Sequence, residues 1–476
     1  MNNRILFKFV FMLLLLFIIG AKLVSNFYLG NLFCIESVWV NICSVLWLIS
    51  ICYALLDVRR RVVYFLFSCT FFIFLMYRPV LGYINGGDWI FSTLGYGAST
   101  DSVLLALQLM ATSLFFIFLG VLIGEFTPFP ANTNTILVKL ASIGVVPSVR
   151  RVSLFLFLIS LSSSIFVSLE AYFFVAAHDY LSYYSEFASR LPYPITVIAR
   201  FSNFFLVIYL CCLPKRKLVF MALSLWVLAT IPYLLMGLRN PFVLAVLFSL
   251  VYFVMRDEVE GHWSFLSKKE SIAIIIGLMI LFVLITFVRG GNGSIADFLY
   301  KQGVSFAWLS AGLNHIDDLR ATNVMSYSFG PFFDYWNHNK IVQFLFGATT
   351  LSSNNSLEQI EMSQIMAHHL SYTLLGERYL QGNGTGSSYL LELFTDFGFV
   401  GVGLFSILLG LFMGVCSKRY ICSFLCFFLV LMTIQGILFM PRAEVLSAFI
   451  IFTQVNFWAS LTLLVVLVWV SEKLIK

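Results

Sequence analysis

The sequence predicts an all-α polytopic membrane protein, and three observations support this fold class. Of the 476 residues, 60% are hydrophobic and only 11% are charged, and the mean hydropathy is +0.94. A soluble globular chain carries about 25% charged residues, and a disordered chain lacks the abundant Leu, Ile, Val and Phe found here. The apolar residues gather in windows of about 20, the length that a helix needs to cross a bilayer. A soluble enzyme and a disordered chain are both excluded.

Twelve apolar windows follow one another, and each predicts a transmembrane helix. They lie near residues 4–25, 35–56, 62–81, 102–124, 152–176, 194–213, 218–236, 240–255, 271–288, 391–416, 420–439 and 445–470. Lys8 and the apolar run after it resemble a signal peptide. However, no Ala-x-Ala cleavage pattern follows Gly20, so we predict an uncleaved first helix.

Lys and Arg collect in every second connection between the windows, which predicts that these connections lie in the cytoplasm. The basic connections contain Arg59, Arg60, Arg61, Lys139, Arg150, Arg151, Lys215, Arg216, Lys217, Arg256, Lys268, Lys269, Lys418, Arg419, Lys473 and Lys476. Both termini are then cytoplasmic. The net charge of +6 therefore reflects topology, and we expect no nucleic-acid partner.

This topology divides the chain into three parts. Residues 1–288 form a bundle of nine helices, residues 289–390 form one large periplasmic loop, and residues 391–476 add three more helices. Within the loop, 295–313 and 359–375 combine helical apolar spacing with polar residues, which predicts short interfacial helices.

Most basic residues on the predicted outer side are arginines. They are Arg78, Arg190, Arg200, Arg239, Arg289, Arg320, Arg378 and Arg442, against Lys22, Lys301 and Lys340. A guanidinium binds phosphate through a planar fork, which a lysine cannot reproduce. The alternative is that each arginine extends to the water interface and pairs with a carboxylate such as Glu170.

Three of these arginines have distinctive positions. Arg239 follows Gly237 in a tight turn and Arg289 precedes Gly290, so the backbone could approach a ligand closely at both. Arg200 falls inside the sixth window, where an unpaired charge is costly, so we expect it to face the interior of the bundle.

The segment 382–388 alternates glycine with polar residues and leads into the tenth window. Free amides and the positive end of the helix dipole suit an anion there, although the same residues also fit an entry loop with Ser387 or Ser388 as N-cap. Glu392 follows one turn inside the helix, with Asp396 on the same face. The sequence leaves open whether Glu392 is a structural partner or a general base.

Histidines and aromatic residues of the outer loop supply further candidates. His338 is the best candidate proton carrier, or else a surface hydrogen-bonding group. Six aromatic residues lie between 327 and 336, a composition that suits either stacking on sugar rings or a membrane aromatic belt. No metal-ligand spacing occurs, so we predict no catalytic metal and no cofactor.

The residues that lead into the tenth helix form a recognisable pattern. They are small residues, two serines, an acid and a Phe-Gly-x-x-Gly motif, namely Ser387, Ser388, Glu392, Phe397, Gly398 and Gly401. This pattern resembles the C-terminal signature of O-antigen polymerases, the Wzy type of oligosaccharide repeat-unit polymerase. Gly237-x-Arg239 is similar to the Gly-x-Arg that this family carries before a late helix.

The resemblance implies a glycosyltransferase that moves a growing glycan from undecaprenyl diphosphate onto a lipid-linked repeat unit. The site would face the periplasm from the bacterial inner membrane, with membrane lipid and a chain-length-determinant protein as further partners. We expect Glu392, His338 and Arg239 in catalysis, with Glu392 or His338 as the base. For the diphosphate we expect Arg200, Arg289, Arg378, Arg442, Ser387 and Ser388, and for glycan stacking Tyr327, Tyr335 and Trp336.

Two other functions compete with this one. An O-antigen ligase would transfer finished glycan to a lipid A core, so it would not lengthen chains from lipid-linked repeat units alone. A lipid-linked oligosaccharide flippase would form no glycosidic bond, and the absence of an evident inverted repeat argues against it. The sugars of the repeat unit and the stereochemical outcome cannot be derived from the composition.

Overall fold

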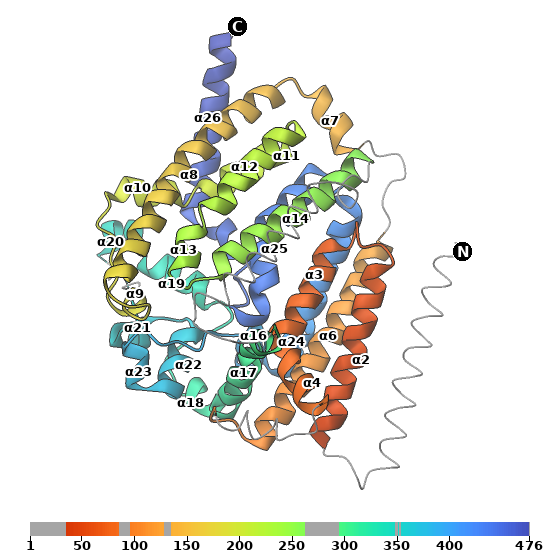
Figure 1. The fold of residues 1–476 in the computed structure, drawn as a ribbon, viewed down its shortest axis with the longest axis vertical. Coiled ribbons are helices and arrows are strands. Elements are labelled where there is room, and N and C mark those ends of the chain that lie inside the picture. Colours follow the sequence, from red (N-terminus) through yellow and green to blue (C-terminus); the bar gives the residue numbers. More distant parts are fainter. Residues whose placement is uncertain are drawn as a thin grey trace.

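The computed structural model describes residues 35–84, 96–127, 135–261, 295–347, 351 and 354–475, and every regular element in them is a helix (Figure 1). Nine helical segments in these ranges are long and apolar enough to cross a membrane. They are α2 (Ile35–Leu55), α3 (Val62–Phe71) continuing through the π-helical η1 (Phe72–Met76) into α4 (Tyr77–Ile84), α6 (Thr100–Phe126), α8 (Val146–Ala177), α10 (Tyr193–Ala199) with α11 (Ser202–Cys211), α12 (Arg216–Leu228) with α13 (Ile231–Leu235), α24 (Tyr389–Arg419), α25 (Phe424–Phe439) with η3 (Met440–Arg442), and α26 (Val455–Ile475).

These segments confirm the all-α polytopic class and coincide with nine of the twelve predicted windows. The eighth window forms the helix α14 (Asn240–Glu260), which carries charged residues in its last turns and is not one of the nine. The windows near 4–25 and 271–288 lie outside the described residues.

Charged residues at one end of the bundle hold neighbouring helices together. Arg61 forms a bidentate ion pair with Glu125 of α6, with N···O distances of 2.6 and 2.8 Å. Its guanidinium also lies 3.9 Å from the centre of the Tyr53 ring. Arg60 pairs with Glu258 at 3.1 Å. This is also the end at which α26 terminates (Figure 1). Three of the connections predicted to be cytoplasmic, those that follow α2, α6 and α14, therefore meet at one end of the molecule.

Glycines bring α6 and α24 into close contact along their length. A Cβ atom added to Gly120 of α6 would lie 2.3 Å from a main-chain oxygen of α24. A Cβ atom at Gly410 of α24 would lie 2.1 Å from the oxygen of Ile117. Small residues allow backbones to approach in this way, and packing is a main source of helix association in lipid. This pair is the centre around which α2, α3 and α17 (Val304–Asn314) pack.

Residues 295–380, within the predicted outer loop, form short helices that lie away from the end at which α26 terminates (Figure 1). Besides α17, they are α16 (Ile295–Gln302), α18 (Ile316–Arg320), α19 (Gly330–His338), α20 (Lys340–Phe346), α21 (Leu357–Met362), α22 (Met366–Leu375) and α23 (Glu377–Leu380). The prediction of an interfacial helix was wrong for α17, because its residues from Ser305 to Leu313 are mostly buried and it packs on α6. A helix that is apolar on all faces belongs in the core.

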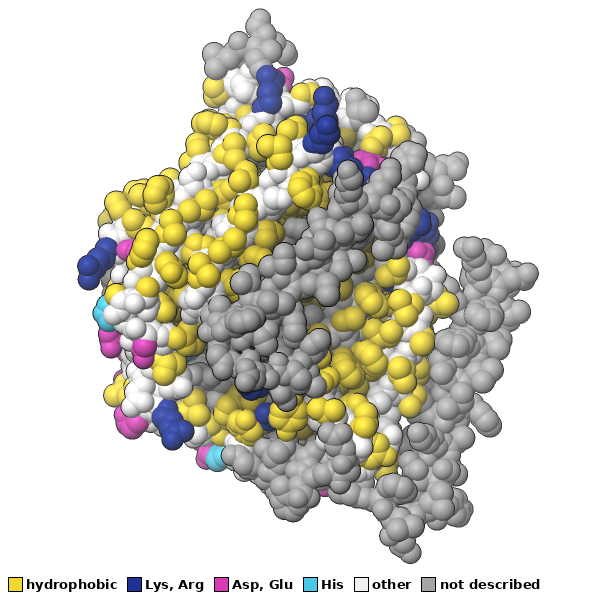
Figure 2. Space-filling view, in the orientation of Figure 1, with side chains coloured by type: hydrophobic (Ala, Val, Ile, Leu, Met, Phe, Trp, Pro, Cys, Tyr) yellow, Lys and Arg dark blue, Asp and Glu magenta, His cyan; other side chains and the backbone are white. Residues whose placement is uncertain are grey.

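Among the described residues in Figure 2, hydrophobic side chains cover broad areas of this face, and most charged side chains lie toward its edges. On α8, Phe155, Phe166 and Phe173 are exposed, and on α26 Trp458 and Trp469 are exposed. In water such a surface would promote aggregation, whereas in a bilayer it is the surface that contacts lipid.

Candidate functional site

Glu392, one turn into α24, joins two segments that are distant in the sequence. Its side chain is 0% exposed. One carboxylate oxygen accepts a hydrogen bond from the Ser387 hydroxyl at 2.7 Å, and the other accepts one from the main-chain N–H of Val445 at 2.8 Å. The carboxylate therefore attaches the beginning of α24 to residues 440–455, the segment that connects α25 to α26.

Ser387 and Ser388 play different roles at this helix start. Ser388 occupies the N-cap position of α24, but its hydroxyl makes no capping hydrogen bond. The Ser388 side chain is 3% exposed, and its Oγ has no hydrogen-bond partner. Ser387, by contrast, donates to Glu392.

The glycine-rich segment before α24 is held firmly by hydrogen bonds. The main-chain oxygen of Arg378 accepts hydrogen bonds from the N–H and the side-chain amide of Asn383, at 3.1 and 3.0 Å. Gly382 has a φ of +92°, and a Cβ atom there would lie 2.2 Å from the oxygen of Leu181. Gly382 is therefore needed for packing against the 177–193 loop. The Arg378 side chain itself is exposed.

Arg442 lies at the end of η3, beside this helix start. A Cβ atom at Gly386 would be 3.8 Å from the main-chain oxygen of Arg442. The Arg442 guanidinium donates to the side-chain oxygen of Gln302 at 3.3 Å and lies 5.9 Å from the centre of the Phe74 ring. Two residues later, burial raises the pKa of the Glu444 carboxyl above its ordinary value. The main chain of Arg442 therefore lies beside the amino-terminal end of the 31-residue helix α24, which is the positive end of the helix dipole.

Helix α24 bends shortly after Glu392. Gly398 has φ 62° and ψ −156°, a conformation that interrupts the helix and that is essentially restricted to glycine. Before the break, Asp396 accepts hydrogen bonds from the Ser326 hydroxyl at 2.7 Å and from the N–H of Ser328 at 2.7 Å. Arg320 donates to the main-chain oxygen of Thr395 at 3.2 Å. The first part of α24 is thus fixed to the outer helices, and our sequence reasoning missed both contacts.

The three aromatic residues predicted to stack on glycan lie in different surroundings. Tyr327 is 2% exposed and donates to the main-chain oxygen of Leu319 at 3.0 Å, so stacking on a glycan is contradicted for this residue. The Tyr335 hydroxyl accepts a hydrogen bond from the N–H of Val455 at 2.9 Å. Trp336 is 40% exposed and remains accessible. Tyr335 therefore places α19 against the same 440–455 segment that Glu392 binds.

His338 ends α19 one turn after Asp334. Burial raises the pKa of the Asp334 carboxyl, which accepts hydrogen bonds from the Ser363 hydroxyl at 2.5 Å and from the N–H of Gln364 at 2.7 Å. The His338 charge acts in the opposite direction on that pKa. His338 is partly exposed, so a proton acceptor at this position could meet a substrate.

No contact given by the structure joins Arg200 or Arg239 to Glu392 or Arg442. Arg239 occupies the N-cap position of α14 and is partly exposed, after a turn in which Gly237 has a φ of +98° next to the Tyr180 ring. Arg200 lies between α10 and α11 and is exposed, which contradicts our expectation that it faces the interior. The helix is interrupted there, so the side chain is not held within a continuous buried turn. Arg289 lies outside the described residues.

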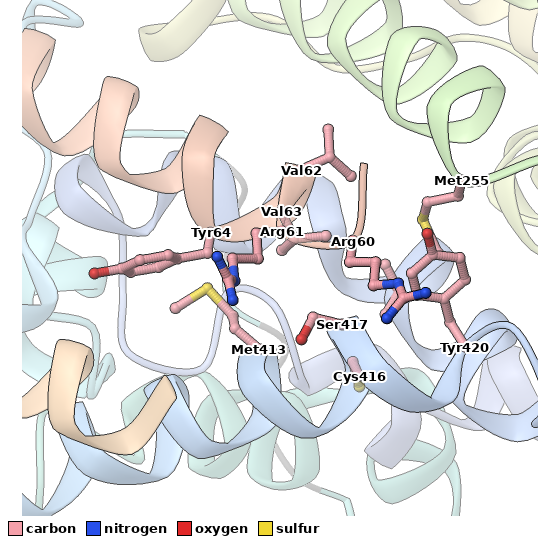
Figure 3. A pocket seen from close by; sticks show the side chains of 11 residues that line it. Arg60, Arg61, Val62, Val63, Tyr64, Met255, Met413, Cys416, Ser417 and Tyr420 are labelled. Carbon is pink, nitrogen blue, oxygen red and sulfur yellow. The ribbon is translucent and has the colours of Figure 1, made fainter. Parts of the chain in front are cut away.

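A small pocket lies at the other end of α24 (Figure 3). Its lining residues are Arg60, Arg61, Val62, Val63, Tyr64, Met255, Met413, Cys416, Ser417, Tyr420 and Val430. None of the predicted site residues lines it. In the part of the chain that the structure describes, no group of three or more His, Cys, Asp or Glu side chains is placed to hold a metal ion.

The fold and the site define a polytopic helical membrane protein with a polar, arginine-containing centre at one end of the bundle. The family model described as O-antigen polysaccharide polymerase Wzy matches residues 5–475, nearly the whole chain. The protein belongs to this family, which confirms the resemblance found in the sequence. Neither the curated proteins nor the solved structures contain a match.

Proposed function

We propose that the protein transfers a growing glycan from undecaprenyl diphosphate onto a lipid-linked oligosaccharide repeat unit, at the periplasmic face of the bacterial inner membrane. Membership of the polymerase family supports polysaccharide polymerisation. The carrier lipid, the membrane and its face follow from the predicted topology and from the chemistry of the site. A chain-length-determinant protein is a further proposed partner.

The observation that carries this proposal is the double hydrogen bond of Glu392. Because its carboxylate binds both Ser387 and Val445, Glu392 holds the 440–455 segment, which contains Arg442, against the amino-terminal end of α24. When the sugar–phosphate bond breaks, negative charge develops on the departing diphosphate. A fixed guanidinium and the positive end of a helix stabilise that charge without reorganising. Arg239, Arg289 and Arg378 are proposed to bind the same carrier, and Arg200 to lie at its entrance.

The geometry favours a positioning role for Glu392 over the role of general base. Its carboxylate is fully buried, and both of its oxygens already accept hydrogen bonds. A general base must come within hydrogen-bond reach of the acceptor hydroxyl. His338 is partly exposed on α19, which Tyr335 holds against the 440–455 segment, so we assign the proton acceptor to His338. Trp336, exposed beside it, is proposed to stack on the acceptor glycan.

The experiment compares Arg442→Gln and Arg239→Gln with Arg151→Gln, an exposed arginine at the other end of the bundle. Each variant is expressed in cells that lack the wild-type protein, its membrane insertion is verified, and the ladder of surface polysaccharide is scored. We expect short ladders from the first two variants and a normal ladder from the third. Normal ladders from inserted Arg442→Gln and Arg239→Gln proteins would remove these assignments.

A further inference from the structure

Arg78, at the start of α4, carries a buried guanidinium with few polar partners among the described residues. The side chain is 7% exposed. Its Nε and one terminal nitrogen have no hydrogen-bond partner, and the other terminal nitrogen donates only to the Tyr96 hydroxyl, at 3.3 Å. No carboxylate pairs with it among the residues that the structure describes.

Aromatic rings partly enclose the Arg78 guanidinium. Its central carbon lies 4.4 Å from the centre of the Tyr300 ring and 5.0 Å from that of Tyr96. Such cation–π contacts are weak compared with the cost of removing a charge from water. A buried guanidinium with free donors is therefore expected to have an anionic partner.

A second arginine lies close to the same short piece of chain. Gly303 packs on Arg78, and a Cβ atom there would lie 3.3 Å from Arg78 Cβ. The preceding residue, Gln302, accepts the hydrogen bond from Arg442. Arg442 also lies over the ring of Phe74, one turn before Arg78. Both arginines therefore lie around residues 300–303.

The backbone before Arg78 is also unusual. Residues Phe72–Met76 form the π-helical turn η1, and such turns inside α-helices occur frequently at functional sites. Phe74 lies within this turn, and η1 contacts both α16 and η3. The π-helical turn is thus part of the same contact region as the two arginines.

We propose that Arg78 binds a phosphate-class anion together with Arg442, and that this anion is the diphosphate of a lipid-linked substrate. The proposal rests on the proposed function and adds to it a ligand that comes from the α3–η1–α4 segment. The free donors of Arg78 match the fork geometry with which a guanidinium binds phosphate oxygens. An anionic phospholipid headgroup offers the same chemistry and is the competing source.

The first experiment measures thermal unfolding of the purified full-length protein in detergent, with and without inorganic pyrophosphate. Arg78→Met keeps the length of the side chain and removes its charge, and Arg151→Met is the matched control at an exposed site. We expect pyrophosphate to raise the Tm of the wild type and of the control, and to raise that of Arg78→Met far less. Without pyrophosphate, Arg78→Met should be at least as stable as the wild type, because it no longer buries a charge with few polar partners. A wild type that does not respond to pyrophosphate would overturn the proposal.

Arg78→Lys keeps the positive charge but loses the planar guanidinium that can bind phosphate through two nitrogens. If Arg78→Met fails to fold, this variant tests whether Arg78 binds the anion. We expect its half-maximal pyrophosphate concentration to rise about tenfold or more, since a bidentate contact is lost. A pyrophosphate response equal to that of the wild type would assign Arg78 to the fold alone and overturn the proposal.

The source of the phosphate is settled by adding lipids to the same assay. Undecaprenyl-diphosphate-linked repeat units should stabilise the wild type at lower concentration than phosphatidylglycerol does, and Arg78→Lys should reduce this advantage. A stronger response to phosphatidylglycerol would overturn the assignment to substrate. These measurements need no turnover, so a protein that binds pyrophosphate through Arg78 but lengthens no glycan would refute the proposed function and leave the anion site in place.

Discussion

The Glu392 carboxylate and the main-chain N–H of Val445 form a 2.8 Å hydrogen bond between residues 53 positions apart. Glu392 belongs to the first turn of α24, and Val445 lies between η3 and η4 (Ile450–Thr453). Through this bond, the position of Arg442 depends on a carboxylate that no substrate needs to touch.

Removal of the Glu392 side chain is expected to destabilise the protein. Glu392→Ala leaves the buried N–H of Val445 without an acceptor, which costs about 1–3 kcal/mol, whereas Glu392→Gln keeps one acceptor oxygen. We expect the Tm in detergent to fall clearly for the alanine variant and less for the glutamine variant. Glu361→Ala, at an exposed glutamate, is the control. An unchanged Tm for Glu392→Ala would show that the bond contributes nothing.

The contact between α6 and α24 should not tolerate even one added methyl group. The Cβ of Gly410→Ala would lie 2.1 Å from the oxygen of Ile117, so the helices must separate. We predict a loss of about 1–3 kcal/mol, measured as a lower Tm and a lower yield of inserted protein. Gly144→Ala, where no atom lies within 4 Å, should behave as wild type. Equal stability of the two variants would contradict the close packing.

The bend of α24 occurs at Gly398, whose backbone conformation interrupts the helix. No atom lies within 4 Å of an added Cβ, so Gly398→Ala tests the conformation without a clash. Because φ is +62°, we expect a cost of about 1–3 kcal/mol. Unfolding by heat in detergent measures it. A stabilised Gly398→Ala protein would mean that the helix runs straight through this position.

Acid should weaken the packing of α22. His368 Nδ1 lies 2.8 Å from the Tyr379 hydroxyl, and burial, with the nearby His369, lowers the His368 pKa from 6.5 to about 4. The unfolded chain therefore takes up this proton at a higher pH than the folded chain, and the free energy of unfolding falls as pH drops from about 6.5 to about 4. The lowered pKa of His369 acts in the same direction, and the raised pKa of Asp334 opposes it.

The measurement is the Tm between pH 7 and pH 5. We expect it to fall for the wild type and for His178→Gln, which alters an exposed histidine, and to fall less for His368→Gln. If His368→Gln loses as much stability in acid as the wild type does, the buried histidine is not the cause.

The membrane architecture was largely predictable because lipid requires long apolar windows, and these are visible in composition alone. The position of Glu392 in the first turn of α24 followed from the serines and glycines before it. Its partner did not, because a main-chain N–H such as that of Val445 leaves no signal in the sequence. Arg78 appeared only as one outward arginine among several, since burial with few polar partners is a property of the folded chain.

The three wrong expectations all concern whether a residue is buried or exposed, which depends on how the chain folds around it. We predicted that Arg200 lies inside a continuous helix. The helix is interrupted between α10 and α11, and the Arg200 side chain is exposed there. Tyr327 was grouped with its aromatic neighbours, yet composition does not distinguish a ring that packs in the core from one that contacts a ligand. Helix α17 was taken as interfacial, although it packs on α6 and most of its residues are buried.

The central claim is that the site formed by Arg442 and the start of α24 transfers glycan from one lipid carrier to a lipid-linked repeat unit. An assay with purified protein tests this claim most directly. The measurement is the length of glycan formed in detergent from undecaprenyl-diphosphate-linked repeat units alone, with no lipid A core present. We predict chains of several repeats from the wild type and from Arg151→Gln, and unextended repeat units from Arg442→Gln. Repeat units that the wild type leaves unextended until a core acceptor is added would contradict the account and favour a ligase.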